Sequence, residues 1–413
     1  SRLCLVDIMH KTKDTIYFLP PFIALLGFYL FNIIGTISVI NEPGLFTYKF
    51  FFTLLALILS FYLFYFIIFQ TKNKWHINWS YTHNYLNSNL IFIAGLWSVC
   101  ILLFLLYYSR HGLPPVFDIN LNEFTNIYLL RGEKWTTLPE GTHWYRVGFF
   151  VLPSFIAIYT FILKKLYGTF KYKVIFYVNL LAALIFLSFP ASKGQYINLI
   201  LYFLICNILL RGKQIKLKTL LSYILGVIVS IFILLRIYLF NRETIEVITI
   251  LPKYIFGRIF ADYSKAHAYL LQIFPSKHEY LWGHSFINPG GIFPLKSINI
   301  SNLLGFYVNR QSLENYSSPS YSQGYVNFGI WGIFLVFILM FMQLLIFQYI
   351  FKKLPKNPLL LTIYIIFLGR LLGYANQGIH LIFPEQLVLV FGIIFIFYYL
   401  LKEIEKFVLS IKN

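Results

Sequence analysis

The sequence predicts an all-α polytopic membrane protein with about ten transmembrane helices. Of its 413 residues, 59% are hydrophobic and only 12% are charged, which is more apolar surface than a soluble core of this size buries. The apolar residues also fall into repeated runs of about 17 to 25 residues, the length that crosses a bilayer as a helix.

The expected spans lie at about 16–40, 50–70, 90–108, 147–163, 174–190, 194–210, 219–240, 325–351, 358–374 and 386–401. We treat 1–413 as a single membrane domain with two long connections, a first loop at 109–146 and a large loop at 241–324. Short basic connections such as KKLYGTFKYK (164–173) and RGKQIKLK (211–218) place their side in the cytoplasm by the positive-inside rule. Both termini are then cytoplasmic and both long loops are extracytoplasmic. This orientation accounts for much of the net charge of +19, so no nucleic acid is expected as a partner.

Arginine is distributed unevenly between the two sides. Of the 34 basic residues, 19 fall in expected inner segments and 17 of those are Lys, whereas eight of the other 15 are Arg. Lysine suffices to set orientation, but a guanidinium group grips phosphate or carboxylate through two parallel hydrogen bonds. We therefore expect an anionic ligand outside; contacts with lipid headgroups or outer carboxylates are the alternative. The eight are Arg110, Arg131, Arg146, Arg236, Arg242, Arg258, Arg310 and Arg370.

Three basic residues fall where lipid makes charge costly. Arg236 and Arg370 lie inside expected spans, and Lys193 lies in the turn between two spans. A charge at the centre of a membrane helix costs roughly 2.5–3.5 kcal/mol on insertion scales, and less near the interface, where long side chains reach water. Such snorkelling explains Arg236 as well as a function does. For Lys193 and Arg370, neighbouring glycines favour a cationic pocket at the outer rim, with all three residues at a similar depth.

The sequence contains no HExxH, no DxD and no paired Cys/His cluster, so neither a metal ion nor another cofactor is expected. His380, in the outer segment YANQGIHLIFPEQ, is a candidate proton acceptor, with helix capping and interface polarity as the alternative. Glu314 and His284, both in the large loop, are equally admissible as the catalytic base.

Within the large loop, residues 253–274 predict a helix on the outer membrane surface, because apolar residues recur three and four apart. On another face Arg258, Asp262 and Lys265 align, which fits either an Arg258–Asp262 salt bridge or a ligand contact. The apolar set is Phe256, Ile259, Phe260, Tyr263, Leu270 and Phe274.

Four stretches between about 120 and 335 resemble the O-antigen and capsule repeat-unit polymerases (Wzy family), which are related to the O-antigen ligases. The family's S-x-S-R-G turn is similar to SFPASKGQYINLILYFLI, with Lys193 where Arg is usual. Its R-x-x-x-W/Y helix and later G-x-G turn resemble GRIFADYSKAHAYLLQIF and YLWGHSF, with Arg258 at the Arg. Its polar-Y-x-x-x-G-x-x-G start of the next span is similar to SQGYVNFGIWGIF. Its basic first outer loop resembles NIYLLRGEKW, which contains Arg131.

The resemblance implies a GT-C-like, metal-independent glycosyltransferase in a bacterial inner membrane, with its active site facing the periplasm. Donor and acceptor would be undecaprenyl-diphosphate oligosaccharides, joined into O-antigen or capsular polysaccharide, with membrane lipid and a chain-length regulator protein as further partners. Lys193 and Arg258 would neutralise the departing diphosphate, assisted by Arg131, Arg242, Arg310 and Arg370.

Two alternatives stay open. An O-antigen ligase or other lipid-sugar transferase is disfavoured because ligases carry a His-Asn pair where this chain reads SPSYSQGY. A flippase or transporter of lipid-linked oligosaccharide needs polar residues through its spans, and here the inner halves are apolar.

Overall fold

A computed structural model of the chain describes residues 29, 32–40, 42, 44–70, 86–118, 145, 147–190, 193–211, 222, 225–226, 229, 232, 249, 256–257, 261–285, 298, 300–309, 318–353, 357–372 and 385–412. All regular secondary structure within these ranges is helical. The expected spans 16–40 and 219–240 fall largely outside them, and other expected spans coincide with helices.

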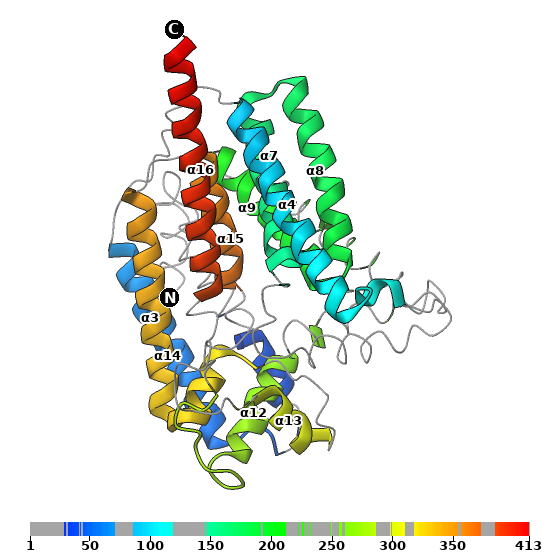
Figure 1. Cartoon of the computed structure of the whole chain (residues 1–413). Coiled ribbons are helices and arrows are strands. Elements are labelled where there is room, and N and C mark those ends of the chain that lie inside the picture. The colour runs from blue at the N-terminus through cyan, green and yellow to red at the C-terminus, as the bar shows by residue number, and fades with distance from the viewer. Residues whose placement is uncertain are drawn as a thin grey trace.

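The helices of the membrane bundle and of the outer loops follow one another along the chain as expected (Figure 1). They are α3 (Tyr48–Gln70), α4 (Leu86–His111), the short η2 (Pro115–Asp118) and η4 (Val147–Val151), α7 (Leu152–Tyr167), α8 (Phe170–Ser188), α9 (Lys193–Arg211), α12 (Asp262–Ile273), α13 (Ile300–Asn309), α14 (Ser320–Lys353), α15 (Pro358–Leu372) and α16 (Glu385–Lys412).

Four helical segments of the described part are long and apolar enough to cross a membrane, at Ser88–His111, Val147–Tyr167, Phe170–Ser188 and Ser320–Gln343. Two shorter apolar helices lie at Tyr48–Ser60 and Pro358–Gly369. The described part is therefore that of an all-α membrane protein, as predicted. The total of ten spans and the GT-C arrangement stay predictions.

Helix α7 forms the centre of the bundle. Every residue from Leu152 to Leu163 is buried, and a helix that is apolar all round is stable only when other helices surround it. Pro153 stands in the first turn, where its missing N–H costs nothing. Gly168 ends the helix in the left-handed conformation (φ 64°), and its N–H donates to the Lys164 carbonyl at 3.0 Å. By contrast, α4 and α8 leave broad apolar faces exposed, as lipid-facing helices do.

Polar side chains tie the bundle helices to one another. The Trp97 indole N–H of α4 donates to Asn179 Oδ1 of α8 at 2.6 Å, and the Tyr159 hydroxyl of α7 donates to Asn89 Oδ1 of α4 at 2.7 Å. Inside a membrane such bonds join helices because the hydrocarbon offers no other partner.

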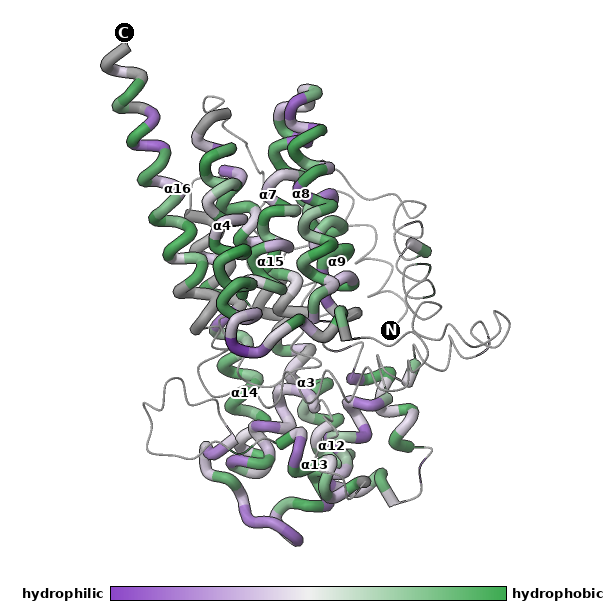
Figure 2. Tube along the Cα trace, turned by 45° about the vertical axis from the view of Figure 1, so that its right-hand side comes forward, coloured by the Kyte–Doolittle hydropathy of each residue, from purple (hydrophilic) through white to green (hydrophobic). Residues whose placement is uncertain are grey.

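The segments expected outside gather at one end of the molecule. In both views α12 and α13 lie beyond the bundle, at the end opposite the C-terminal end of α16 (Figures 1 and 2). Apolar colour dominates the bundle in Figure 2, and hydrophilic residues collect at this outer end. At the same end the Val116 amide of η2 donates to the Phe189 carbonyl after α8 at 3.2 Å. The start of the 109–146 loop is thus fixed beside the turn that precedes α9.

Candidate functional site at the outer end of the bundle

Most of the predicted site residues lie outside the described residues. This holds for the candidate bases His380 and Glu314, and for the predicted diphosphate ligands Arg131, Arg242, Arg258 and Arg310. For Lys193 and Arg370 the helical backbone is described but not the side-chain surroundings. His284 alone among the candidate bases is described throughout.

The helices that carry Lys193 and Arg370 pack directly on each other. Gly369 of α15 lies against the ring of Tyr202 of α9, so closely that a Cβ atom at this position would overlap the ring. Lys193 is the first residue of α9, nine residues before Tyr202 (202 − 193). At 1.5 Å per residue, Arg370 therefore lies about 13 Å further along the axis of α9 than Lys193 does. The two backbones share a helix pair, but they do not share the single depth that the sequence suggested.

A buried polar cluster holds α12 against α3 and α14, and we call it the α12 clamp: Thr53, His267 and Ser322. The His267 ring is fully buried, with Nδ1 2.9 Å from Ser322 Oγ and Nε2 3.3 Å from Thr53 Oγ1. Tyr321 packs edge-on against the ring at a centroid distance of 4.8 Å. Burial without a neighbouring carboxylate in these contacts lowers the pKa of His267 to about 3, so the imidazole is neutral at physiological pH.

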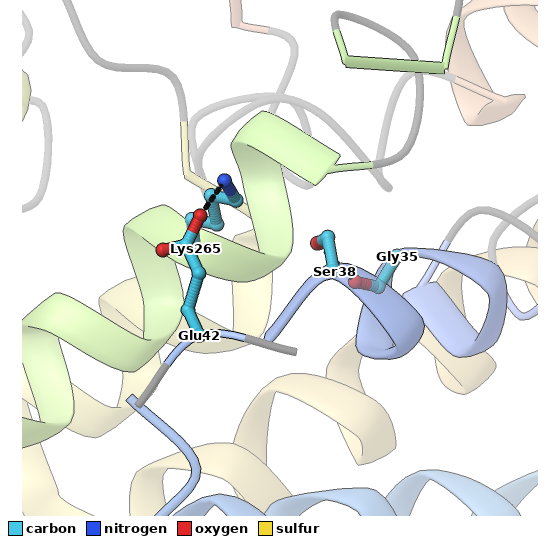
Figure 3. A network of polar contacts seen from close by, with 4 residues as sticks. All are labelled: Gly35, Ser38, Glu42 and Lys265. Carbon is cyan, nitrogen blue, oxygen red and sulfur yellow. Dashed lines mark hydrogen bonds and ion pairs between the residues drawn. The ribbon is translucent and has the colours of Figure 1, made fainter. Parts of the chain in front are cut away.

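Further contacts extend the attachment of α12 to the preceding chain. Lys265 forms an ion pair with Glu42 in the segment before α3 (Figure 3). Lys49 Nζ lies 3.4 Å from the carbonyl oxygens of both Leu271 and Phe274 at the C-terminal end of α12, where a cation suits the helix dipole. Lys265, predicted to face a ligand or another helix residue, thus contacts a carboxylate elsewhere in the chain.

The predicted helix at 253–274 is described from Asp262 onward. Leu270 and Phe274 of its expected apolar set are buried, whereas Phe256 is exposed. The buried face of α12 also includes Ala266, His267 and Leu271, and it packs on α3, α13 and α14. Its location on the membrane surface stays a prediction.

Helix α14 is broken where the motif YVNFGIWG begins the span. Phe328 and Gly329 depart from helical geometry, and Gly329 has φ 63°. Beyond the break, Gly332 touches the backbone of Gly324 so closely that a side chain on either would overlap it. The glycines of this motif therefore allow the first eight residues of α14 (320–327) to pack back against the following turns.

The break receives a segment of the large loop, residues 279–285 (EYLWGHS), which we call the outer strap. A helix end leaves carbonyls without partners, and here the Leu281 amide donates to the Val326 carbonyl at 2.8 Å and the Trp282 amide to the Asn327 carbonyl at 3.3 Å. The Gly283 amide donates to Asn327 Oδ1 at 2.7 Å. Strap and helix break thus form one hydrogen-bonded unit.

Asn327 is the centre of this unit. Its side chain is fully buried, accepts from Gly283, and donates through Nδ2 to Ser285 Oγ and, at 2.6 Å, to the Gln323 carbonyl. Gly283 and Ser285 flank His284, so Asn327 fixes the backbone on both sides of this candidate base. His284 is half-buried, and its own carbonyl accepts from the Ile298 amide at 2.6 Å.

Comparisons of the chain with protein-family models, with curated proteins and with solved structures find no match. Within the described residues, no group of three or more His, Cys, Asp or Glu side chains is arranged to hold a metal ion. The α12 clamp and Asn327 are the two features that sequence reasoning missed. Their only sequence signal is a polar residue within an otherwise apolar helical face.

Proposed function

We propose that this protein polymerises lipid-linked oligosaccharide repeat units at the outer face of a bacterial inner membrane. The donor is an undecaprenyl-diphosphate oligosaccharide, and the acceptor is the non-reducing end of a second lipid-linked repeat unit. A bond forms between the acceptor hydroxyl oxygen and the anomeric carbon of the donor. The bond from that carbon to the diphosphate oxygen breaks, and undecaprenyl diphosphate leaves.

The observation that carries the proposal is the rigid outer assembly at the break of α14. Two of the stretches that resemble the polymerases, YLWGHSF and SQGYVNFGIWG, are far apart in sequence. The outer strap and the helix break bring them together through the amides of Leu281, Trp282 and Gly283. The helix that follows the third stretch, α12, is locked to the same assembly through His267. A transferase needs fixed groups around its substrate, because misplaced groups lose much of the benefit of proximity.

In this mechanism the cations stabilise the leaving group. Lys193 and Arg258 hold the diphosphate and neutralise the charge that develops on it as the glycosidic bond breaks; Arg131, Arg242, Arg310 and Arg370 assist. One of His284, His380 and Glu314 removes the proton of the acceptor hydroxyl. His284 has the best defined backbone of the three, since Asn327 holds both of its neighbours.

Transport is the less favoured function. Asn32 and Asn179 are polar residues inside expected spans, and a transporter would use such groups to line a pathway. Both are buried and bonded, Asn32 Oδ1 to the Tyr321 hydroxyl at 2.9 Å and Asn179 Oδ1 to Trp97. They join helices to one another.

Reconstitution of purified protein with lipid-linked repeat units tests the proposal. Longer lipid-linked chains should form without nucleotide sugar and with chelator present. Lys193→Ala and Arg258→Ala should abolish chain growth while leaving membrane insertion intact. Lys171→Ala is the matched control, because Lys171 is exposed at the start of α8, at the opposite end of the bundle. Absence of chain growth by the wild type, or wild-type growth by both variants, would contradict the proposal.

A further inference from the structure

Trp282 has a strained backbone and an exposed side chain. Its φ is 45°, in the left-handed region that bulky residues rarely adopt, yet 68% of its surface is exposed. Residues held in this region persist only where the surrounding structure fixes them, and they cluster at functional sites. Here the amides of residues 281–283 are all bonded to Val326 and Asn327, and these bonds fix the backbone.

The neighbouring rings brace the indole without covering its face. Phe328 lies at a centroid distance of 6.1 Å with an interplanar angle of 68°, and Tyr280 lies at 6.5 Å with an angle of 82°. Both contacts are edge-on, so neither ring stacks on the indole. The result is a rigid aromatic plate that faces outward from the outer strap.

The residues around Trp282 favour a sugar over lipid as its ligand. Ser276, Lys277 and Glu279, just before it in the chain, are exposed, and His284 follows two residues later. Charged side chains at this density are unsuited to a surface that faces acyl chains. A pyranose suits the combination, because its C–H face packs on an aromatic ring while its hydroxyls bond to the polar groups beside it.

Trp331 shows what a lipid-facing tryptophan looks like in the same protein. It is 80% exposed on the apolar segment Ser320–Gln343, and its exposed neighbours Ile330 and Phe334 are apolar. The two exposed tryptophans therefore stand in opposite chemical surroundings, and each serves as the control for the other.

We propose that the Trp282 indole is a stacking platform for a pyranose ring of the polysaccharide repeat unit, with His284 at its edge. The proposal rests on the proposed function for the identity of the glycan. It places glycan binding at the break of α14, on a side chain whose orientation is set by Asn327.

The test measures binding by the full-length protein in lipid nanodiscs. The probe is an oligosaccharide of a few repeat units, released by mild hydrolysis from the surface polysaccharide of the organism that makes the protein. Trp282→Ala should weaken binding about tenfold or more, as expected when an aromatic anchor is truncated. Trp282→Phe should keep part of the affinity, because it retains a ring, and Trp331→Phe should keep all of it.

A second measurement compares the tryptophan emission lost in Trp282→Phe and Trp331→Phe when the nanodiscs contain brominated phosphatidylcholine. The lipid should quench Trp331 and spare Trp282. Equal quenching of both, unchanged affinity in Trp282→Ala, or no binding by the wild type would overturn the platform. If the wild type binds the oligosaccharide yet makes no polymer, the polymerase fails and the platform stands. If the wild type makes polymer and Trp282→Ala binds as well as it does, the platform alone fails.

Discussion

Replacing His267 with glutamine should remove an acid-sensitive step from the attachment of the outer loop. The His267 ring is fully buried between Thr53 and Ser322, and burial lowers its pKa to about 3. Glutamine retains a donor and an acceptor for the two hydroxyls but does not titrate. The variant therefore isolates the cost of protonating this ring.

The sign and size of the effect follow from the two pKa values. The unfolded pKa of histidine is about 6.5, so between pH 6.5 and about pH 3 the opened state binds a proton that the closed state excludes. The stability of the clamp is complete above pH 6.5 and falls as the pH is lowered through this window. From pH 7 to pH 5 the loss is about 2 kcal/mol, or roughly thirtyfold in the opening equilibrium.

Hydrogen exchange of the α12 amides measures this opening. Between pH 7 and pH 5, wild-type protection should fall about thirtyfold further than that of His267→Gln, after correction for intrinsic exchange. His278→Gln is the control, because His278 lies in the turn after α12 and its Nδ1 contacts the Glu279 carbonyl; it should follow the wild type. Equal loss of protection in wild type and His267→Gln would refute the assignment of His267 as the acid-sensitive residue.

Two further predictions concern the break of α14. Gly332→Ala should destabilise the protein by more than about 1 kcal/mol, because its methyl group overlaps the Gly324 backbone, whereas Gly392→Ala on α16 has open space and should be neutral or stabilising; thermal unfolding in detergent compares them, and equal midpoints would contradict the packing. Asn327→Ala should release the outer strap at a cost of about 2–3 kcal/mol, because it leaves the Gly283 amide without its acceptor. Faster exchange at amides 281–283 would show this, with the α7 amides as the internal control, and unchanged exchange there would refute it.

The helical bundle was predictable because the bilayer leaves few choices. An apolar run that must satisfy its own backbone hydrogen bonds forms a helix, and helices appear at expected spans such as 174–190 and 358–374. Helix register was not predictable in the same way. The contact between Gly369 and Tyr202 sets the offset between Lys193 and Arg370, and a composition argument contains no information on that contact.

The outer assembly was predictable only as a set of motifs. The sequence shows a tyrosine followed by spaced glycines at the start of a span, but not that Gly329 takes φ 63° or that Gly332 meets Gly324. His267 reaches partners 214 and 55 residues away in sequence, Thr53 and Ser322. Pairings over such separations depend on tertiary packing, which local patterns do not encode.

The shared hydrogen bonds between the outer strap and α14 restrict how this protein can be re-engineered. The backbone amides of Leu281 and Trp282 complete a helix end that belongs to another part of the chain. A chimera that exchanged the large loop for that of a different protein would leave those carbonyls exposed at the membrane boundary. Domain grafting would therefore have to transfer residues 279–285 and 320–332 together, as one module.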